Sequence, residues 1–299
     1  MTVGTVVRLR TYAKVNLFLR VIGTRADGFH EIETILHGIG LYDEIEMAVT
    51  EGSIDVSMEL VDGLTGSLPA AADNLIRHAA DVLHAHSGVS SGVSVKVRKG
   101  IPIAAGLGGG SGNAAGALVI LGDMWGVELD RDTTMSLAAR IGSDVPYCIE
   151  GGTVLATSRG EHLTQLPATA SMCFVLGGTN DPLSTADVYA AWDGLSPAEP
   201  SSSAALTLAL GAGDVAEVGA LLHNDLEPAA FSLLPDLADK KRALLDADAL
   251  GAGMSGSGPT MFAVARDEAH ALRIADRAGA AFDWVKVVGS HRPCIERLD

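Results

Sequence analysis

The stretch "GIPIAAGLGGGSGNAAGALVILGDMW", Gly100–Trp125, decides how the rest of the chain is interpreted. Five glycines fall within the seven residues from Gly106 to Gly112, and the residues that follow recur at helical spacing, namely Ala114, Leu118, Leu121 and Trp125. Glycine lets a backbone approach a ligand closely, and the exposed amides of a helix N-terminus attract anions. The stretch therefore predicts a phosphate-binding loop before a helix, and the alternative is a flexible turn.

Two familiar nucleotide-binding patterns do not fit this loop. A P-loop needs a lysine directly after its last glycine, and none follows here. The dinucleotide pattern GxGxxG fails because Ser111 stands at its last position. A better match, "GAGMSG" (residues 251–256), precedes the strand-like "TMFAVA" where that fold requires a helix. The loop must therefore serve another phosphate-binding fold.

Composition limits the possible partners. The chain has 299 residues, of which 47% are hydrophobic, which predicts about two domains, placed at residues 1–160 and 161–299. A net charge of -16 argues against a nucleic-acid or anionic-membrane partner, since both need a positive face. Two long uncharged runs, 100–122 and 163–180, are broken by Gly, Pro and polar residues, so no membrane span is expected. We expect a small-molecule substrate.

Cysteine usage and the N-terminus point to the cytoplasm. Cys148, Cys173 and Cys294 share no close spacing and cannot all pair, so neither a disulfide framework nor a CxxC metal site is expected. The first residues are interrupted by Arg and Lys every few positions, unlike a signal peptide.

Hydrophobic periodicity predicts a mixed, α+β fold. Alternating apolar residues indicate strands in "TVVRLR", "SVKVRK", "CFVLGG" and "MFAVA". Helices are expected at residues 72–85, 133–141, 216–223, 236–246 and 268–278. Gly142 is placed to end the second of these helices. This order favours α+β over a regular βαβ series.

The glycine loop carries a family resemblance. "PIAAGLGGGSGNAA" resembles the P-x-x-x-G-L-G-[GS]-[GS]-S signature of the GHMP kinase superfamily, in which the loop wraps the triphosphate of ATP. Five other stretches, in order and spacing, resemble the 4-diphosphocytidyl-2-C-methyl-D-erythritol kinase family of the non-mevalonate isoprenoid pathway: "AKVNLFLRVIGTRADGFHEIET", "DNL", "IGSDVPYCIEGGTVLATSRGEHL", "HNDLEPAA" and "GAGMSGSGPTMFAV". The resemblance covers about residues 7 to 265, and "RADGFH" is its most family-specific part.

This resemblance implies a fold and a reaction. The fold would be the two-domain GHMP kinase fold, with an N-terminal ribosomal-protein-S5-like ATP-binding domain and a C-terminal ferredoxin-like domain. The reaction would be transfer of the γ-phosphoryl group of ATP, with Mg²⁺, to the 2-hydroxyl of 4-diphosphocytidyl-2-C-methyl-D-erythritol. The chain would act as a monomer or homodimer in the cytoplasm.

Two residues are expected to carry the chemistry, which needs a proton acceptor and positive charge near the transferred phosphoryl group. The resemblance places the catalytic base at Asp144, and the alternative is an ordinary capping or turn Asp. Lys14 interrupts an apolar strand pattern and must find an anion, so a structural salt bridge is its alternative role. Beside Asp144, Lys14 would favour the ionised carboxylate and the developing alkoxide.

The remaining predicted site residues follow from the resemblance and from the chemistry of their side chains. The ATP-binding set comprises Pro102, Gly106, Leu107, Gly108, Gly109, Gly110, Ser111, Asn113, Asp73, Asn74 and Lys99. The acceptor-binding set comprises Asn16, Phe29, His30, Ser184, Thr185, Gly253, Ser255 and Gly256. Within the second set, Phe29 would stack on the cytosine and His30 would hydrogen-bond to it. No metal ligand is assigned.

Other roles stay open for several of these residues. His30 could be a structural histidine beside a core Phe, Asp73 a helix cap, and Lys99 a solvated cation. Two positions depart from the family pattern. Phe29 stands where Tyr is usual, and Gly112 follows Ser111 where Ser or Ala is common. The second departure leaves Ser111 as the contributor to a phosphate or metal contact.

Two other functions are also compatible with the glycine loop. The first alternative is another GHMP kinase acting on homoserine, mevalonate or a sugar, and the second is a non-catalytic nucleotide-binding protein. "RADGFH" argues against the first, and the presence of both Lys14 and Asp144 argues against the second. "HEIETILH" is not an HExxH zinc site, because its histidines, His30 and His37, are seven residues apart.

Overall fold

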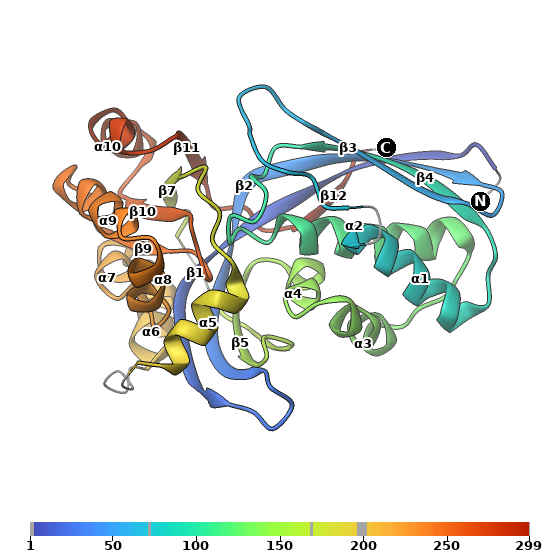
Figure 1. Ribbon diagram of the computed structural model, residues 1–299, viewed down its shortest axis with the longest axis horizontal. Coiled ribbons are helices and arrows are strands. Elements are labelled where there is room, and N and C mark those ends of the chain that lie inside the picture. Colours follow the sequence, from blue (N-terminus) through green and yellow to red (C-terminus); the bar gives the residue numbers. More distant parts are fainter. Residues whose placement is uncertain (1–2, 71–72, 168–169, 196–201, 299) are drawn as a thin grey trace.

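Two halves, each built on one β-sheet, make up the computed structural model (Figure 1), which describes residues 3–70, 73–167, 170–195 and 202–298. The elements of the first half are β1 (Val6–Thr24), β2 (His30–Thr50), β3 (Ile54–Leu60), α1 (Leu75–Ser87), β4 (Gly92–Lys99), α2 (Gly109–Trp125), α3 (Arg131–Ile141), α4 (Val145–Glu150), β5 (Thr153–Ser158) and β6 (His162–Gln165). The elements of the second half are β7 (Cys173–Gly178), α5 (Thr185–Asp193), α6 (Ala204–Ala212), α7 (Val215–Ala220), β8 (His223–Asn224), α8 (Glu227–Leu233), α9 (Asp236–Asp246), β9 (Gly251–Met254), β10 (Met261–Ala265), α10 (Glu268–Ala278), η2 (Gly279–Ala281), β11 (Trp284–Gly289) and β12 (Ile295–Arg297).

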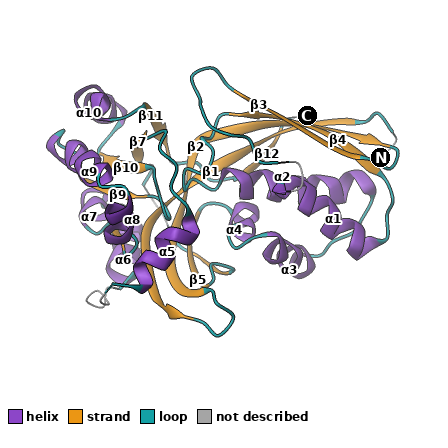
Figure 2. Ribbon diagram, in the orientation of Figure 1, coloured by secondary structure: helices purple, strands orange, loops and turns teal. Residues whose placement is uncertain are grey.

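The N-terminal sheet runs in the order β12-β1-β2-β4-β3, with β5 and β6 continuing from β2 and β8 pairing with β1. Helices α1 to α4 lie together on one side of this sheet (Figure 1). The C-terminal half holds a four-stranded antiparallel sheet in the order β11-β7-β10-β9, with helices α6 to α10 around it (Figure 2). With a crossover after β7 and another after β10, this order is the ferredoxin-like arrangement. The predicted α+β class is confirmed.

A long antiparallel hairpin of β1 and β2 joins the two halves. Residues 11–19 of β1 are all buried, because both halves pack against this segment. Three register irregularities, at Tyr12/Ala13, Asn16/Phe18 and Val21/Gly23, bend the hairpin along its length. Strands β8 and β12 follow β7 of the C-terminal sheet and still pair with β1 of the N-terminal sheet, so the chain crosses between the halves more than once.

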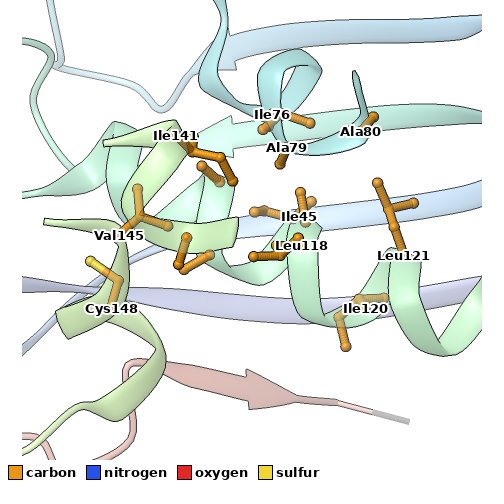
Figure 3. Packing of buried hydrophobic residues seen from close by; sticks show 14 of the residues in the cluster. Ile45, Ile76, Ala79, Ala80, Leu118, Ile120, Leu121, Ile141, Val145 and Cys148 are labelled. Atoms are coloured by element: carbon orange, nitrogen blue, oxygen red, sulfur yellow. The ribbon is translucent and has the colours of Figure 1, made fainter. Parts of the chain in front are cut away.

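The N-terminal core lies between the sheet and helices α1 to α4. Figure 3 shows Ile45 of β2 facing Ile76 of α1 and Leu118 of α2, with Val145 and Cys148 of α4 closing one end. Each fully buried aliphatic side chain of this kind contributes roughly 1.5–3 kcal/mol of hydrophobic free energy. This packing holds α2, and therefore the glycine loop at its start, firmly against β1.

Close contact between α2 and β1 depends on a small residue. A Cβ at Gly116 would lie 2.8 Å from the side chains of Leu9 and Thr11. The glycine-rich composition of α2 thus serves the packing of helix on sheet as well as the loop that precedes it.

The helix predictions are mostly confirmed. Those at 236–246 and 268–278 match α9 and α10, and the one at 133–141 matches α3 with Gly142 at its C-cap. The helix expected from residue 72, which lies outside the described residues, begins at Leu75 as α1. The helix predicted at 216–223 is wrong at its end, because His223 and Asn224 form β8 beside β1. Backbone pairing with the long hairpin overrides the local helical pattern.

The three cysteines are free thiols. None of the helices in the described part of the chain combines the length and apolar character needed to cross a bilayer.

Candidate active site

The glycine loop ends at the first turn of α2. Gly106 and Gly108 have left-handed backbone angles, φ 73° and φ 74°, which non-glycine residues rarely adopt. The first helical hydrogen bond runs from the Gly112 amide to the Gly108 carbonyl, at 2.8 Å. The amides of residues 109–111 therefore lie at the open N-terminal end of the helix, where an anion would be stabilised.

The glycines of this loop differ in what they contact. A Cβ at Gly106 would lie 2.2 Å from the Ser255 carbonyl oxygen, and one at Gly109 would lie 2.9 Å from Ile101 Cγ2. A Cβ at Gly110 would meet only Leu75 Cδ1, at 3.6 Å. Gly106 and Gly109 are thus required by packing, whereas Gly110 faces space that a ligand could fill.

Two cavities meet at this loop. The larger, about 770 Å³, extends along the β1–β2 hairpin to Phe29 and His30. The smaller, about 460 Å³, lies between the loop, α1 and the end of β4. Gly106, Gly108, Ser111 and Thr185 line both cavities. Ligands in the two cavities would therefore meet at the helix N-terminus.

Lys14 and Asp144 lie together in the larger cavity. Lys14 Nζ is 3.4 Å from Asp144 Oδ2, and the lysine is only 4% exposed. Asp144 occupies the N-cap position of α4, but its side chain makes no capping hydrogen bond. The carboxylate, 37% exposed, is therefore directed toward Lys14 and the cavity. The expected proximity of the pair is confirmed, and capping by Asp144 is ruled out.

A chain of hydrogen bonds orients the amide of Asn16. Lys14 Nζ donates to Asn16 Oδ1 at 2.7 Å, and Asn16 Nδ2 donates to Thr34 Oγ1 at 2.8 Å. Thr34 Oγ1 donates in turn to the Phe18 carbonyl at 2.6 Å. All three side chains are buried and line the larger cavity. Lys14 is thereby held by the neutral Oδ1 of Asn16 as well as by Asp144.

Aromatic residues and a histidine form the other end of the larger cavity. His30 Nε2 donates to Asp193 Oδ1 at 2.8 Å, and the imidazole lies 4.6 Å from the Tyr189 ring. The bond from His30 is the main cause that lowers the pKa of Asp193. Burial raises the pKa of Tyr189, so this ring is a neutral phenol. Phe29 is 49% exposed and offers a ring face to the cavity.

The smaller cavity contains the whole predicted ATP-binding set. Asn74, and not Asp73, caps α1, because its Oδ1 accepts from the Ile76 amide at 3.0 Å. Lys99 is buried and paired with Asp43, so the solvated alternative is wrong. Asp43 also accepts from two backbone amides, while its burial raises its pKa and Lys99 opposes that rise.

Asn113 also belongs to the smaller cavity. Its Oδ1 accepts from Thr11 Oγ1 at 2.8 Å, while its Nδ2 is buried with no hydrogen-bond partner among the described residues. An unpaired buried donor is costly, so this amide is suited to a ligand that accepts a hydrogen bond.

Three predicted acceptor residues lie outside both cavities. Ser184 caps α5 by accepting from the Asp187 amide at 3.3 Å, and Gly253 packs in β9 against the Phe262 ring. Ser255 Oγ donates to the Gly106 carbonyl at 2.9 Å. Ser255 thus supports the glycine loop, and Ser184 supports the start of α5. Their part in acceptor binding, with that of Gly253, stays a prediction. Thr185 and Gly256 do line the larger cavity.

Some lining residues have no counterpart in the sequence prediction. Thr185, Tyr189 and Asp193 recur every four residues on α5, and all three line the larger cavity. Helical spacing counted from Thr185 could have found the other two. Arg159, in the turn between β5 and β6, also lines this cavity. It falls within a stretch that carries the family resemblance, but the sequence prediction gave it no role.

His37, the second histidine of the rejected zinc motif, lies away from the cavities. It is hydrogen-bonded to Thr153 Oγ1 and Ser290 Oγ, each at 2.8 Å. Burial lowers its pKa to about 4, so the ring is neutral.

Comparison with known proteins bears on the same regions. The profile for the GHMP kinases N terminal domain matches residues 74–152, and the profile for the GHMP kinases C terminal region matches residues 206–283. The chain belongs to the GHMP kinase family. The two matches fall on either side of the predicted boundary at residue 160, which itself stays a prediction.

Individual relatives narrow the comparison for this GHMP kinase. It is 40% identical over 283 residues to the 4-diphosphocytidyl-2-C-methyl-D-erythritol kinase of Pelotomaculum thermopropionicum, covering 94% of this chain and 96% of the relative. It is 38% identical over 301 residues to the protein of the same name in Thermobifida fusca, covering 98% of each chain. These values place the chain with the 4-diphosphocytidyl-2-C-methyl-D-erythritol kinases of the family.

Solved structures agree with this placement. A crystal structure of 4-(cytidine 5'-diphospho)-2C-methyl-D-erythritol kinase matches with a TM-score of 0.75 and 30% identity, covering 95% of this chain and 98% of that chain. A homoserine kinase from Cytophaga hutchinsonii matches with a TM-score of 0.77 but only 21% identity, over 100% of this chain and 99% of that one. The second likeness shows the shared fold alone.

Residue Gly110 gives a direct test of the phosphate loop in this GHMP kinase. Gly110→Val places side-chain atoms in space that meets only Leu75, so we expect an intact fold and roughly 10-fold or greater loss of affinity for a non-hydrolysable ATP analogue. Calorimetric titration measures the affinity, and thermal unfolding checks the fold. Gly109→Val is a poorer test, because its Cβ would collide with Ile101. Unchanged affinity in Gly110→Val would make the loop a turn without a ligand role.

Proposed function

We propose that this chain is an ATP-dependent kinase that phosphorylates the 2-hydroxyl of 4-diphosphocytidyl-2-C-methyl-D-erythritol. The names of its relatives support the substrate. The observation that carries the proposal is the Lys14–Asp144 pair, which lies in a cavity that meets a second cavity at the glycine loop. A donor and an acceptor bound in the two cavities would meet beside this pair.

The proposed chemistry uses the pair directly. Asp144 accepts the proton of the acceptor hydroxyl as its oxygen bonds to the γ-phosphorus of ATP, and the bond from that phosphorus to the bridging oxygen of ADP breaks. Lys14 stabilises the negative charge that develops on the attacking oxygen and the transferred group. Its bonds to Asn16 and Asp144 hold the ammonium group in place while this occurs.

The glycine loop and the smaller cavity would hold ATP. The amides at the start of α2 receive the phosphates, as in other helix N-terminal phosphate sites. Residues 73–74, Lys99 and Asn113 surround the space beyond the loop, where the adenosine would lie. The unpaired Nδ2 of Asn113 is the donor in this cavity that gains most from a ligand.

Mg²⁺ would enter with ATP. No group of three or more His, Cys, Asp or Glu side chains that could hold a metal occurs in the described part of the chain. This fits Mg²⁺ carried by nucleotide phosphates, an ion that keeps several waters and needs only one or two protein oxygens. Ser111, which lines both cavities, would supply one of them. The ion would neutralise charge on the β- and γ-phosphates.

The far end of the larger cavity would hold the cytidine. Phe29 offers an exposed ring for stacking. His30 is held through its Nε2 by Asp193, so its Nδ1 takes no part in that bond. The alternative of a purely structural His30 accounts for its bond to Asp193 but not for its place in the cavity lining. A cytoplasmic location is part of the proposal, because three free thiols suit a reducing compartment.

One assay tests the function. The chain is incubated with Mg-ATP and each of a panel of alcohols, comprising 4-diphosphocytidyl-2-C-methyl-D-erythritol, homoserine, mevalonate and a sugar. A new phosphomonoester signal in ³¹P NMR identifies the acceptor. We expect the signal with the cytidylated alcohol. A stronger signal with another alcohol would leave only the broader kinase assignment, and no signal with any acceptor would favour a non-catalytic nucleotide-binding protein.

A further inference from the structure

Arg159 lines the larger cavity, and its guanidinium group forms no ion pair with a carboxylate of the described residues. Its guanidinium carbon lies 4.1 Å from the centre of the Phe29 ring, and its Nε is buried without a hydrogen-bond partner among the described residues. None of the ion pairs found between described residues includes it. The other charged groups that line the cavity are coupled, Lys14 with Asp144 and His30 with Asp193.

Nearby carboxylates already have partners. Asp27 is paired with Arg25, whose bonds are the main cause of its lowered pKa, and Arg159 contributes the least to that shift. Glu161 Oε2 accepts from the backbone amide of Arg159 at 2.8 Å, and Glu161 Oε1 accepts from Ser158 Oγ at 3.1 Å. The Arg159 side chain thus keeps donors available for an anionic ligand.

The sheet register places Arg159 toward the end of the cavity that holds Phe29 and His30. His30, Ile32 and Thr34 alternate along β2 and all line the cavity, spanning about 13 Å at the usual rise of a strand. Ser158 of β5 pairs with Ile32, the middle residue of the three. Because β5 runs antiparallel to β2, Arg159, which follows Ser158, lies on the His30 side of the middle of this row, where its guanidinium meets the Phe29 ring.

The turn that carries Arg159 also packs near the catalytic loop. A Cβ at Gly160 would lie 3.7 Å from the Ser143 carbonyl oxygen, and Ser143 directly precedes Asp144. The turn thus approaches the Asp144 side of the cavity through Gly160, while the Arg159 side chain covers one face of Phe29.

We propose that Arg159 binds the diphosphate that links the nucleoside and alcohol parts of the acceptor. This inference rests on the proposed function, in which the cytosine lies at Phe29 and His30 and the reacting hydroxyl lies at Lys14 and Asp144. The diphosphate leaves a nucleoside held at Phe29 in the direction of Asp144, so it passes beside Arg159, and guanidinium is well matched to paired phosphate oxygens. The stack on Phe29 keeps the guanidinium plane fixed, so less freedom is lost on binding.

The alternative role of Arg159 is to support the Phe29 ring without contacting the ligand. Comparing a ligand that has the diphosphate with one that lacks it distinguishes the two roles. Cytidine and CDP are titrated calorimetrically into the full chain with the nucleotide cavity saturated by a non-hydrolysable ATP analogue. We expect CDP to bind the unmodified protein at least ~10-fold more tightly than cytidine. Arg159→Gln should remove that advantage and leave cytidine affinity within about twofold.

Controls make the result specific. Arg77→Gln removes an exposed charge on α1, away from both cavities, and should keep the CDP advantage. The advantage in the unmodified protein should shrink as salt concentration rises. Equal weakening of cytidine and CDP in Arg159→Gln, or no weakening of either, would overturn the diphosphate role. Failure of the unmodified protein to bind cytidine at all would instead count against the proposed function.

Discussion

Replacing Asp144 by Asn lowers turnover roughly 10²-fold or more, while a non-hydrolysable ATP analogue binds as before. Asn keeps the size of the side chain but removes the charge and the ability to accept the hydroxyl proton. The structure supports the fold of this variant, because the Asp144 side chain makes no capping bond and Lys14 keeps its bond to Asn16. Steady-state kinetics gives the turnover, and calorimetry gives the affinity.

Asp130→Asn is the matched control for this experiment. Asp130 caps α3 by accepting from the Thr133 amide at 2.8 Å, lies outside both cavities, and can be replaced by Asn without loss of capping. Its turnover should stay near that of the unmodified protein. If Asp144→Asn behaved like Asp130→Asn, Asp144 would not be the base.

Removing the cytidine diphosphate from the acceptor should lower kcat/KM at least ~10³-fold. Free 2-C-methylerythritol keeps the reacting hydroxyl but offers nothing to Phe29 and His30. Remote binding energy is used in part to orient the reacting group, so part of the loss should appear in kcat. Competing initial rates with the two alcohols measure the ratio.

His30→Ala should reduce this difference in kcat/KM. It should lower kcat/KM for the cytidylated acceptor and leave kcat/KM for free 2-C-methylerythritol unchanged. A variant on the ATP side should instead affect both acceptors alike. Lys99→Ala is a poor choice for that control, because it would leave the buried carboxylate of Asp43 without its cation and destabilise the fold. Gly110→Val is the better one. An unchanged rate with the cytidylated alcohol in His30→Ala would remove His30 from acceptor recognition.

Local patterns in the sequence were sufficient for the position of the loop and for several of the helices and strands. The glycines before the apolar residues of α2 predicted a helix N-terminus open to anions, and periodicity located α9 and α10. These features depend on backbone conformation and on the spacing of residues a few positions apart, which the sequence states directly. The family resemblance added Lys14, Asp144 and the ends of the site, whose catalytic and binding roles stay predictions.

Contacts between residues far apart in the sequence were decided only by the tertiary structure. Lys99 could be judged buried and paired only once Asp43, on a neighbouring strand, was in place. Arg159 became a cavity residue because β5 pairs with β2 in a register that sets Ser158 beside Ile32. The capping bond of Ser184 and the contact of Gly253 with Phe262 were likewise visible only in the structure. Each outcome depends on contacts between segments far apart in the sequence, and a local pattern of residue types carries no information on strand register or on which buried group meets which charge.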